Sequence, residues 1–351
     1  MTESNLTAAE LLELSAAGYA AMAAADLLET DATITQRYGA GALASWKANY
    51  VQRLLELAAA LRIGSPAAFT SRVVWQHNAF LARGREAGDL RTALSSLRAT
   101  LVAELPDTAG RPAAAYIDEA LSVLDAGVAL EECALDPADP SGALALKYIA
   151  ACLEGNPRRA IALVMEAAGD SESLEAIYLD VIFPAMREIG RMWHGAEASV
   201  AEERMVSETT RRLMTLLTHR RAQVENTGKT VITAAVAGNA HDMGVRAVAD
   251  FFEAAGWRSL CLGANVPAAD VAYAAQFFGA DLVVLAATLT TQIKSLQATI
   301  AALRASTGEG ARILVGGLAL ADSPDLWQRL GADGFAGAGE AVEIGRELVG
   351  L

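Results

Sequence analysis

The sequence predicts a multidomain chain in which helical segments come first and an α/β domain with a doubly wound parallel sheet comes last. Residues 1 to about 225 are rich in Ala, Leu, Glu and Arg, and their apolar residues recur at the three- and four-residue intervals of one helix face. After residue 229, short apolar and β-branched runs alternate with helical stretches. That alternation is typical of consecutive βα units.

Five short runs predict the strands of this sheet. They are TVITAAVA from Thr230, WRSLCLG from Trp257, DLVVLAA from Asp281, ARILVGG from Ala311 and a weaker DGFAGA from Asp333. We expect the flavodoxin-like strand order 2-1-3-4-5, which makes strands one, three and four neighbours. The loops that follow these three strands should then open on one crevice, where doubly wound sheets bind ligands.

Turn-forming composition divides the helical part into two modules. The segment LDPADPSG, Leu135 to Gly142, holds two prolines, and ENTGK near residue 227 separates the last helix from the first strand. We therefore expect three modules, at residues 1–134, 141–225 and 229–351. Within the first, AELPDTAGRP near residue 108 predicts an internal loop between helical hairpins.

Charge and cysteine content narrow the function classes. With 28 Lys+Arg and 42 Asp+Glu the formal net charge is −14, which argues against a direct nucleic-acid partner. Cys133, Cys152 and Cys261 form no CxxC pair, so we expect neither a disulfide scaffold nor a thiolate zinc site. Because the N-terminus is acidic and no uninterrupted apolar run reaches about 18 residues, we expect a cytoplasmic protein without a membrane partner.

The heptad GNAHDMG, Gly238 to Gly244, follows the first predicted strand and opens the next helix. In the predicted crevice His241 would lie near the hydroxyls of TLTT, residues 288–291, and near Gly316 and Gly317, which allow close backbone approach. An imidazole on such a loop can be one axial ligand of a metal whose other ligands come with a cofactor. The alternative is an ordinary polar loop residue beside a helix N-terminus.

GNAHDMG resembles the D/E-x-H-x-x-G signature of cobalamin-binding domains. LGANVP (residues 262–267), the Thr-rich loop and the glycine pair lie where that family places its other signatures. The resemblance implies base-off cobalamin, with His241 as the lower cobalt ligand, Gly244 beside the nucleotide tail, and Gly316 and Gly317 in contact with that tail. The same loops contribute the other expected cofactor contacts, which are Asn239, Asp242, Met243, Thr288 and Thr290.

Two positions depart from the family pattern. Asn239 stands where the family has an acidic residue, so we expect a neutral and weaker acceptor behind the imidazole and a more exchangeable Co–His bond. The S-x-L signature falls on residues 286–288 or, shifted, on residues 288–290. Both registers stay open.

Residues 173–214 carry a second pattern. Most of their apolar stripe is expected to be helical core, Gly195 should end one helix, and Ser199-x-x-Glu202 predicts a capping box that begins the next. The order Trp193-His194, Val200, Glu203 resembles the W-x9-E-H pattern of the helix bundle that covers cobalamin in light-sensing, adenosylcobalamin-dependent proteins. Arg204 replaces the final histidine of that pattern.

This second resemblance implies a four-helix bundle cap over the cofactor. Trp193, Val200 and Glu203 would form the pocket of the adenosyl group, and His194 would ligate cobalt after light has cleaved the Co–C bond. The purely structural alternatives are a core position for Trp193 and a solvent-exposed charge for Glu203. A histidine that enters the freed position would move the bundle relative to the sheet.

The first module weakly resembles the heme-free, globin-like helical domains of bacterial signalling proteins, and the module order resembles photocobilins, which pair cobalamin with biliverdin. Such a bilin needs an apolar pocket and cations for its propionates. Arg72, Trp75, His77 and Arg83 are available for this, while a covalent link through Cys133 or Cys152 is less favoured. A plain sensory or dimerisation module is the alternative.

We therefore expect a non-enzymatic, cobalamin-dependent photoreceptor with adenosylcobalamin and a candidate second chromophore, biliverdin. Two rivals stay open, a corrinoid carrier of a methyltransferase system and a cobalamin-level sensor without photochemistry. No DNA-reading element and no kinase or cyclase motif is evident. The output should then be a light-dependent change in homo-oligomeric assembly or in contact with an unknown downstream protein.

Overall fold

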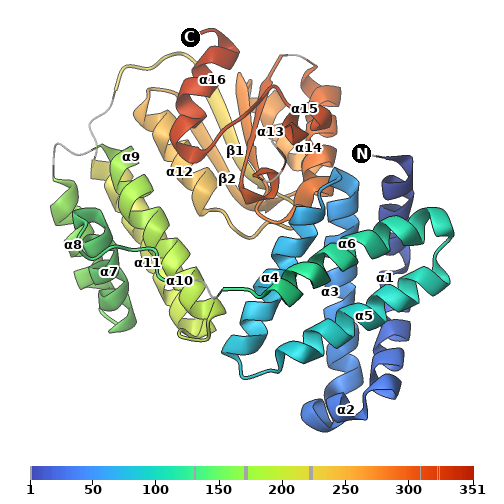
Figure 1. Ribbon diagram of the computed structural model, residues 1–351. Helices are drawn as coiled ribbons and strands as arrows, with labels where there is room; N and C mark the ends of the chain where they lie inside the picture. The colour runs from blue at the N-terminus through green and yellow to red at the C-terminus, as the bar shows by residue number, and fades with distance from the viewer. Residues whose placement is uncertain are drawn as a thin grey trace. The chain divides into compact units, whose positions relative to one another are not determined.

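The computed structural model describes residues 2–129, 132–169, 173–220, 224–308, 310–321, 323 and 325–351. The chain divides into two compact units, Met1–Leu130 and Glu131–Leu351 (Figure 1). The first unit is helical. The second holds further helices and the α/β sheet.

Unit 1 is built around its first helix, α1, which packs against α3, α5 and α6. The buried face of α1 is mostly alanine, which lets neighbouring helices approach closely. This helix is long and apolar enough to cross a membrane by length and composition, but its buried face belongs to the core of unit 1. The elements of the unit are α1 (Glu3–Thr30), α2 (Ala32–Tyr38), η1 (Gly39–Gly41), α3 (Ala42–Ile63), α4 (Pro66–Ala82), α5 (Ala87–Glu104) and α6 (Asp107–Ala126).

The break predicted near residue 108 lies at Leu105 and Pro106, between α5 and α6, and it is shorter than the predicted segment because α6 already begins at Asp107. Pro106 stands before the first turn and an acidic residue opens it, and both are signals that start a helix. A Cβ on Gly110 would lie 3.1 Å from the carbonyl oxygen of Leu101 in α5. This glycine therefore permits close packing of two helices and does not mark a turn.

The first half of unit 2 is a group of helices with one shared apolar core, which includes Tyr148, Val164, Ile189 and Leu213. Pro184 lies in the first turn of α10, directly after a π-helical segment with which that helix is continuous. We call these helices the cap. They are α7 (Pro140–Leu153), α8 (Pro157–Ala168), α9 (Leu174–Ala176), the π-helical η2 (Ile177–Ile182), α10 (Phe183–His194) and α11 (Val200–Arg220).

The second half of unit 2 is a parallel sheet with the order β2-β1-β3-β4-β5, which confirms the predicted order (Figure 1). The inner strand β1, between β2 and β3, is buried along its whole length. The elements of this second half are β1 (Thr230–Val236), α12 (Met243–Ala254), β2 (Arg258–Val266), α13 (Ala268–Phe278), β3 (Leu282–Ala286), η3 (Thr290–Gln292), α14 (Ile293–Thr307), β4 (Arg312–Gly316), η4 (Leu318–Leu320), α15 (Leu326–Leu330), β5 (Gly334–Phe335), η5 (Ala338–Glu340) and α16 (Ala341–Val349).

Strand β2 extends further than its sequence pattern indicates. It continues through Gly263 and Asn265, which have φ values of 77° and 54°. Its register against β1 shifts at this point. The segment LGANVP is therefore an irregular end of the edge strand, and not a separate loop.

Helix α12 joins the cap to the sheet within unit 2. Its residues Ala247 and Phe251 belong to the same apolar core as Tyr178 and Val181 of the cap. The Tyr178 hydroxyl donates a hydrogen bond to Asp250 Oδ2 over 2.7 Å, and the Tyr178 and Phe251 ring centroids lie 5.4 Å apart. The cap therefore rests on the helix that the histidine loop opens.

Candidate functional site

His241 lies on the loop that joins β1 to α12, at the carboxyl edge of the sheet. Strand β1 pairs with β2 on one side and β3 on the other, so this loop stands where the strand order reverses. The His241 side chain is exposed, and its main-chain N–H donates to Asn239 Oδ1 over 3.1 Å. The loop therefore presents the imidazole outward without using it for packing.

Asn239 has a different role from the expected one. Its side chain is buried, and its Nδ2 donates to the carbonyl oxygen of Ala286 at the end of β3, over 3.0 Å. Its Oδ1 accepts from the main chain of His241 and not from the imidazole ring. The expectation that Asn239 orients the ring as an acceptor is therefore corrected: its amide joins the histidine loop to the neighbouring strand.

Two amides that the sequence analysis missed complete the loop framework. Gly238 N–H donates to Asn265 Oδ1 over 2.7 Å. Gln292 is buried; its Oε1 accepts from the main chains of Thr288 and Leu289 at 2.8 and 3.0 Å, and its Nε2 donates to Gly238 O at 3.1 Å. A glutamine just before a helix is the only signal in the sequence, and its burial and its partners are visible only in the fold.

The glycine pair fits the crowded ends of β3 and β4. Gly317 has a φ of 102°, and a Cβ there would lie 2.2 Å from Ala287 O. A Cβ on Gly316 would lie 2.7 Å from Ala336 O. These glycines are therefore required by backbone packing. Thr288 and Thr290 lie partly exposed in the same loop cluster.

Open space surrounds the other two glycines of the histidine loop. A Cβ on Gly238 or on Gly244 would meet nothing within 4 Å, and both residues are exposed. Met243, the first residue of α12, lies between these two glycines in the sequence and is partly exposed. An exposed imidazole beside uncovered backbone fits a flat group held on His241 with a chain that passes Gly244.

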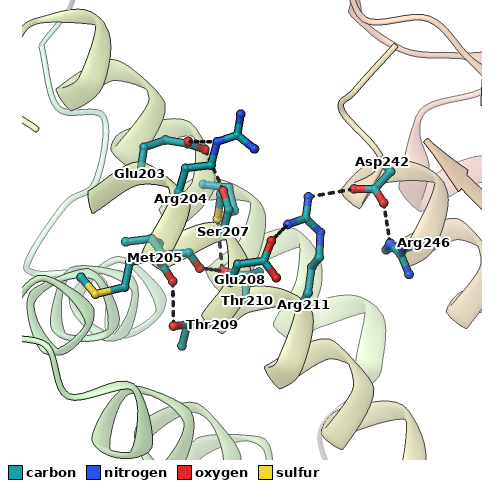
Figure 2. Close-up of polar contacts among 12 residues, drawn as sticks. Glu203, Arg204, Met205, Ser207, Glu208, Thr209, Thr210, Arg211, Asp242 and Arg246 are labelled. Carbon is teal, nitrogen blue, oxygen red and sulfur yellow. Dashed lines mark hydrogen bonds and ion pairs between the residues drawn. The ribbon is translucent and has the colours of Figure 1, made fainter. Parts of the chain in front are cut away.

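Asp242 is bound by two arginines. It is 4% exposed, Arg246 Nε lies 2.7 Å from its Oδ2, and Arg211 Nη2 of the cap lies 3.2 Å from its Oδ1 (Figure 2). Burial acts to raise the pKa of Asp242, but the two guanidinium groups outweigh it and hold that pKa below its ordinary value. Its carboxylate therefore links the histidine loop to α11, a role that the assignment to cofactor binding did not include.

The expected cap residues occupy the end of α10 and the start of α11. The capping box is confirmed, since Ser199 N–H donates to Glu202 Oε2 at 2.7 Å and Glu202 N–H to Ser199 Oγ at 3.2 Å. Val200 is 59% exposed, and Glu203 accepts a 2.7 Å hydrogen bond from Ser207 Oγ. Neither the Val200 nor the Glu203 side chain is buried in the core of the cap.

Trp193 and His194 differ in burial. Trp193 is partly exposed, whereas His194 is 5% exposed at the last position of α10, where Gly195 caps the helix. Successive helical residues point about 100° apart, so the two side chains leave the helix in different directions. His194 must leave a buried position before it can bind anything outside the cap.

A separate set of buried polar atoms lies in unit 1. Arg53 Nη1 of α3 lies 2.5 Å from Glu56 Oε2 and donates to Arg72 O of α4 at 3.1 Å. Burial, and then the charge of Arg91, lower the pKa of His77. Among the described residues of this unit, the side-chain atoms buried without a hydrogen-bond partner include Trp46 Nε1, Asn49 Oδ1, Arg53 Nε, Thr70 Oγ1, Gln76 Oε1, His77 Nδ1 and Asn78 Oδ1.

Of the other residues weighed for this unit, the Arg72 guanidinium lies 4.9 Å from the Trp75 ring centroid. Arg83 is exposed and donates to Ala79 O over 3.1 Å. Cys133 is exposed, whereas Cys152 is buried in the cap, where burial raises the pKa of its thiol. A thiol in that setting is a poor nucleophile for covalent attachment.

The family comparisons agree with the geometry of unit 2. A model described as B12 binding domain matches residues 229–344, and a second model with the same description matches residues 144–218. The chain carries B12-binding domains. Their two spans cover the sheet with the His241 loop and most of the cap.

Two relatives that share these domains are different types of protein, a corrinoid protein and a transcriptional repressor. The chain is 28% identical over 170 residues to a corrinoid protein of Desulfitobacterium hafniense, which covers 46% of this chain and 77% of that protein. It is 27% identical over 158 residues to the HTH-type transcriptional repressor CarH of Myxococcus xanthus, over 45% of this chain and 52% of the repressor. The matched region therefore spans about half of the repressor.

Among solved structures, the monomethylamine corrinoid protein of Methanosarcina barkeri resembles this chain with a TM-score of 0.51 and 23% identity, over 57% of this chain and 96% of that protein. This similarity shows a shared fold of helices and a parallel α/β sheet. Cobalamin binding is supported by the domain matches and by these corrinoid-binding relatives.

Proposed function

We propose that this protein is a non-enzymatic light sensor that holds adenosylcobalamin base-off, with His241 below the cobalt and the cap above it. When bound, adenosylcobalamin supplies a cobalt–carbon bond that visible light cleaves. The observation that carries the proposal is the partly buried Glu203, held by Ser207 on the face of α11 that continues to the histidine loop. A carboxylate in this setting can accept hydrogen bonds from ribose hydroxyls.

The chain's own residues then have separate tasks. The exposed His241 imidazole would hold the metal, and the open space at Gly244 would admit the nucleotide tail. Val200 and Trp193 offer partly exposed apolar surface that excludes water from the upper face. His194 is buried in the structure, and it becomes a ligand only if the end of α10 rearranges.

Illumination separates the proposal from its rivals. Purified protein is loaded with adenosylcobalamin in the dark, and absorbance and elution volume are recorded before and after green light. A light sensor converts irreversibly and changes size. An abundance sensor changes size on binding alone, and an unchanged spectrum after illumination would refute the proposed function.

His194→Ala tests the upper ligand in the same assay. Dark loading should persist, because the proposed dark contacts come from other residues, while the spectrum of the illuminated end state should change. His219→Ala is the matched control, since His219 is an exposed histidine near the end of α11. An identical photoproduct in His194→Ala would remove His194 from the mechanism.

A corrinoid carrier is the second candidate for unit 2, favoured by the similarity to corrinoid proteins. A carrier must open its upper face to a partner enzyme that loads or removes a methyl group. Methylcobalamin-loaded protein should then transfer its methyl group to a partner methyltransferase in the dark. Glu203→Ala should leave that transfer unchanged, whereas it should weaken adenosylcobalamin binding in a light sensor.

For unit 1 we propose a planar, carboxylate-bearing chromophore of the biliverdin class. The buried polar atoms between α3 and α4 support this, because unpaired buried groups cost stability unless a partner satisfies them. Arg72, whose Nε is buried without a hydrogen-bond partner, supplies positive charge for propionates, and Trp46 supplies an aromatic wall beside Phe80 at 6.1 Å between ring centroids. A plain helical module leaves these atoms unexplained.

Expression with a biliverdin source tests this second chromophore. A bound bilin gives red or far-red absorbance that stays with the folded protein. Gln76→Leu should reduce the bound pigment, because it removes a buried amide whose Oε1 lacks a protein partner. A colourless protein in which Gln76→Leu raises the melting temperature would favour a structural module instead.

A further inference from the structure

One face of α11 runs from the proposed adenosyl pocket to the histidine loop. Glu203, Ser207 and Arg211 are four residues apart, so they lie along one side of the helix (Figure 2). Ser207 is buried and donates to Glu203 Oε1 over 2.7 Å. Arg211 Nη2 leaves the same face and reaches Asp242 Oδ1 over 3.2 Å.

Asp242 is the residue directly after His241, and its carboxylate is nearly buried. Its second partner, Arg246, lies one turn further along the helix that Asp242 precedes, at 2.7 Å. Arg246 therefore moves with the loop. Among the contacts described for this carboxylate, the ion pair with Arg211 is the one that comes from the cap.

Arg211 also contacts a second carboxylate, on its own helix. Its Nη1 lies 2.5 Å from Glu208 Oε1, and the Glu208 side chain is 68% exposed. An exposed ion pair is weak because water screens it, whereas the buried Asp242 depends more strongly on its partners. Arg211 thus bridges a weak intrahelical contact and a strong contact to the loop, and it keeps the weak one if the cap moves away.

We propose that Arg211 is a positioning residue that couples the cap face bearing Glu203 to the loop bearing His241. A ligand that fixes Glu203 also fixes the helix that holds Asp242. Movement of α11 releases Asp242, and the loop with its imidazole loosens. The identity of the ligand rests on the proposed function, but the coupling contact is built from the chain's own side chains.

Hydrogen exchange on protein prepared without cobalamin tests the contact itself. Arg211→Ala should speed exchange of the Gly238, Asn239 and His241 amides about tenfold, because loss of one buried charge-assisted bond raises local opening. Arg212→Ala is the matched control, an exposed arginine on the same helix that should leave these amides unchanged. Equal exchange in both variants overturns the proposal, even if cobalamin binds normally.

Arg211→Lys replaces Arg211→Ala in the hydrogen-exchange experiment if the alanine variant does not fold. Lysine keeps the charge but loses the planar fork, so exchange should rise by less than in Arg211→Ala and above wild type. Wild-type rates in Arg211→Lys would then show that the guanidinium geometry is irrelevant and would overturn the proposal. Circular dichroism identifies which variant is folded.

A double-mutant cycle tests whether the two ends of the face act together. Dark dissociation constants for adenosylcobalamin are measured for Glu203→Ala, Arg211→Ala and the double variant. Each single change should weaken binding about tenfold, and the double variant should bind clearly better than the product of the two effects predicts. Strictly multiplicative effects would overturn the coupling. A wild type that binds no cobalamin would refute the proposed function, yet the exchange result would stand.

Discussion

Tyr178 in the π-helical segment donates its hydroxyl hydrogen to the carboxylate of Asp250 on α12, over 2.7 Å. Tyr178 is fully buried, and the same hydroxyl lies 3.3 Å from Met214 O of α11. One side chain therefore holds η2, α11 and α12 together. This contact fixes the cap on the helix that begins at the histidine loop, so its strength should be measurable in the stability of unit 2.

Tyr178→Phe should lower the free energy of unfolding by about 1–3 kcal/mol, because it leaves the Asp250 carboxylate with one partner fewer in a partly buried interface. Urea unfolding measures the difference. Tyr273→Phe is the control, since Tyr273 is 64% exposed and stacks on Phe277 through its ring alone. Equal stabilities for the two variants would contradict a structural role of the Tyr178 hydroxyl.

The pH dependence of stability should carry the signature of Asp250. Burial raises the pKa of this carboxyl above its ordinary value of 3.8, although hydrogen bonds from Tyr178 and Thr218 act in the opposite direction. The folded state therefore binds its proton more tightly than the unfolded state. The stability that this group contributes is complete below about pH 4 and is lost as the pH rises through the raised pKa.

Asp250→Asn removes this titration while keeping an acceptor for Tyr178. The variant should therefore gain stability relative to wild type between about pH 4 and pH 7, and the two should differ least under the most acidic conditions. Urea unfolding at several pH values gives the two curves. Curves that stay parallel throughout this range would show that the carboxyl is not perturbed.

His241→Ala should abolish cobalamin retention and leave the fold unchanged. The imidazole is exposed, and the structural hydrogen bond at this position is made by the main-chain N–H, which alanine keeps. The melting temperature of the protein without cobalamin should stay within about 1 °C of wild type, as is usual for a surface change. Normal cobalamin binding, read from the absorbance of the loaded protein, would contradict the ligand assignment.

The two glycines at the ends of the loop cluster should respond in opposite ways. Gly317→Ala should cost about 3 kcal/mol or more, because a Cβ would lie 2.2 Å from Ala287 O at a φ of 102°. Gly244→Ala should be neutral or stabilising in the protein without cobalamin, since its Cβ enters open space within α12. It should nevertheless weaken cobalamin binding if the nucleotide tail passes there. Thermal unfolding and equilibrium binding measure both effects.

The sequence predicted the sheet well because its signals are local. Alternating βα units gave the strand runs and their order, and the capping box at Ser199 and Glu202 formed as expected. The helix start at Asp107 was missed, because the glycine in that segment serves packing between helices. Glycine can therefore mark a turn or permit two helices to pack closely, and composition cannot distinguish these two roles.

The site was less predictable because its side chains act through tertiary partners. His241 and the open glycines lie where the loop motif indicates. Some side chains join segments that are far apart in sequence, and no local pattern marks them. They are Asn265, Gln292 and Arg211. Asp242 was assigned to the ligand because of its neighbours in the motif, whereas its burial and two arginines are visible only in the fold.

Asn239→Asp restores the acidic residue of the family motif and should nevertheless destabilise this protein. Asn239 Nδ2 donates to Ala286 O over 3.0 Å, and a carboxylate cannot donate, so two oxygens would face each other in a buried position. We expect a loss of about 1–3 kcal/mol in urea unfolding, mostly from the unsatisfied carbonyl and the buried charge. Asn265→Asp is the matched control, because Asn265 uses its Oδ1 as an acceptor and a carboxylate keeps that bond. If Asn239→Asp proved as stable as wild type, the amide could not be what joins the histidine loop to β3.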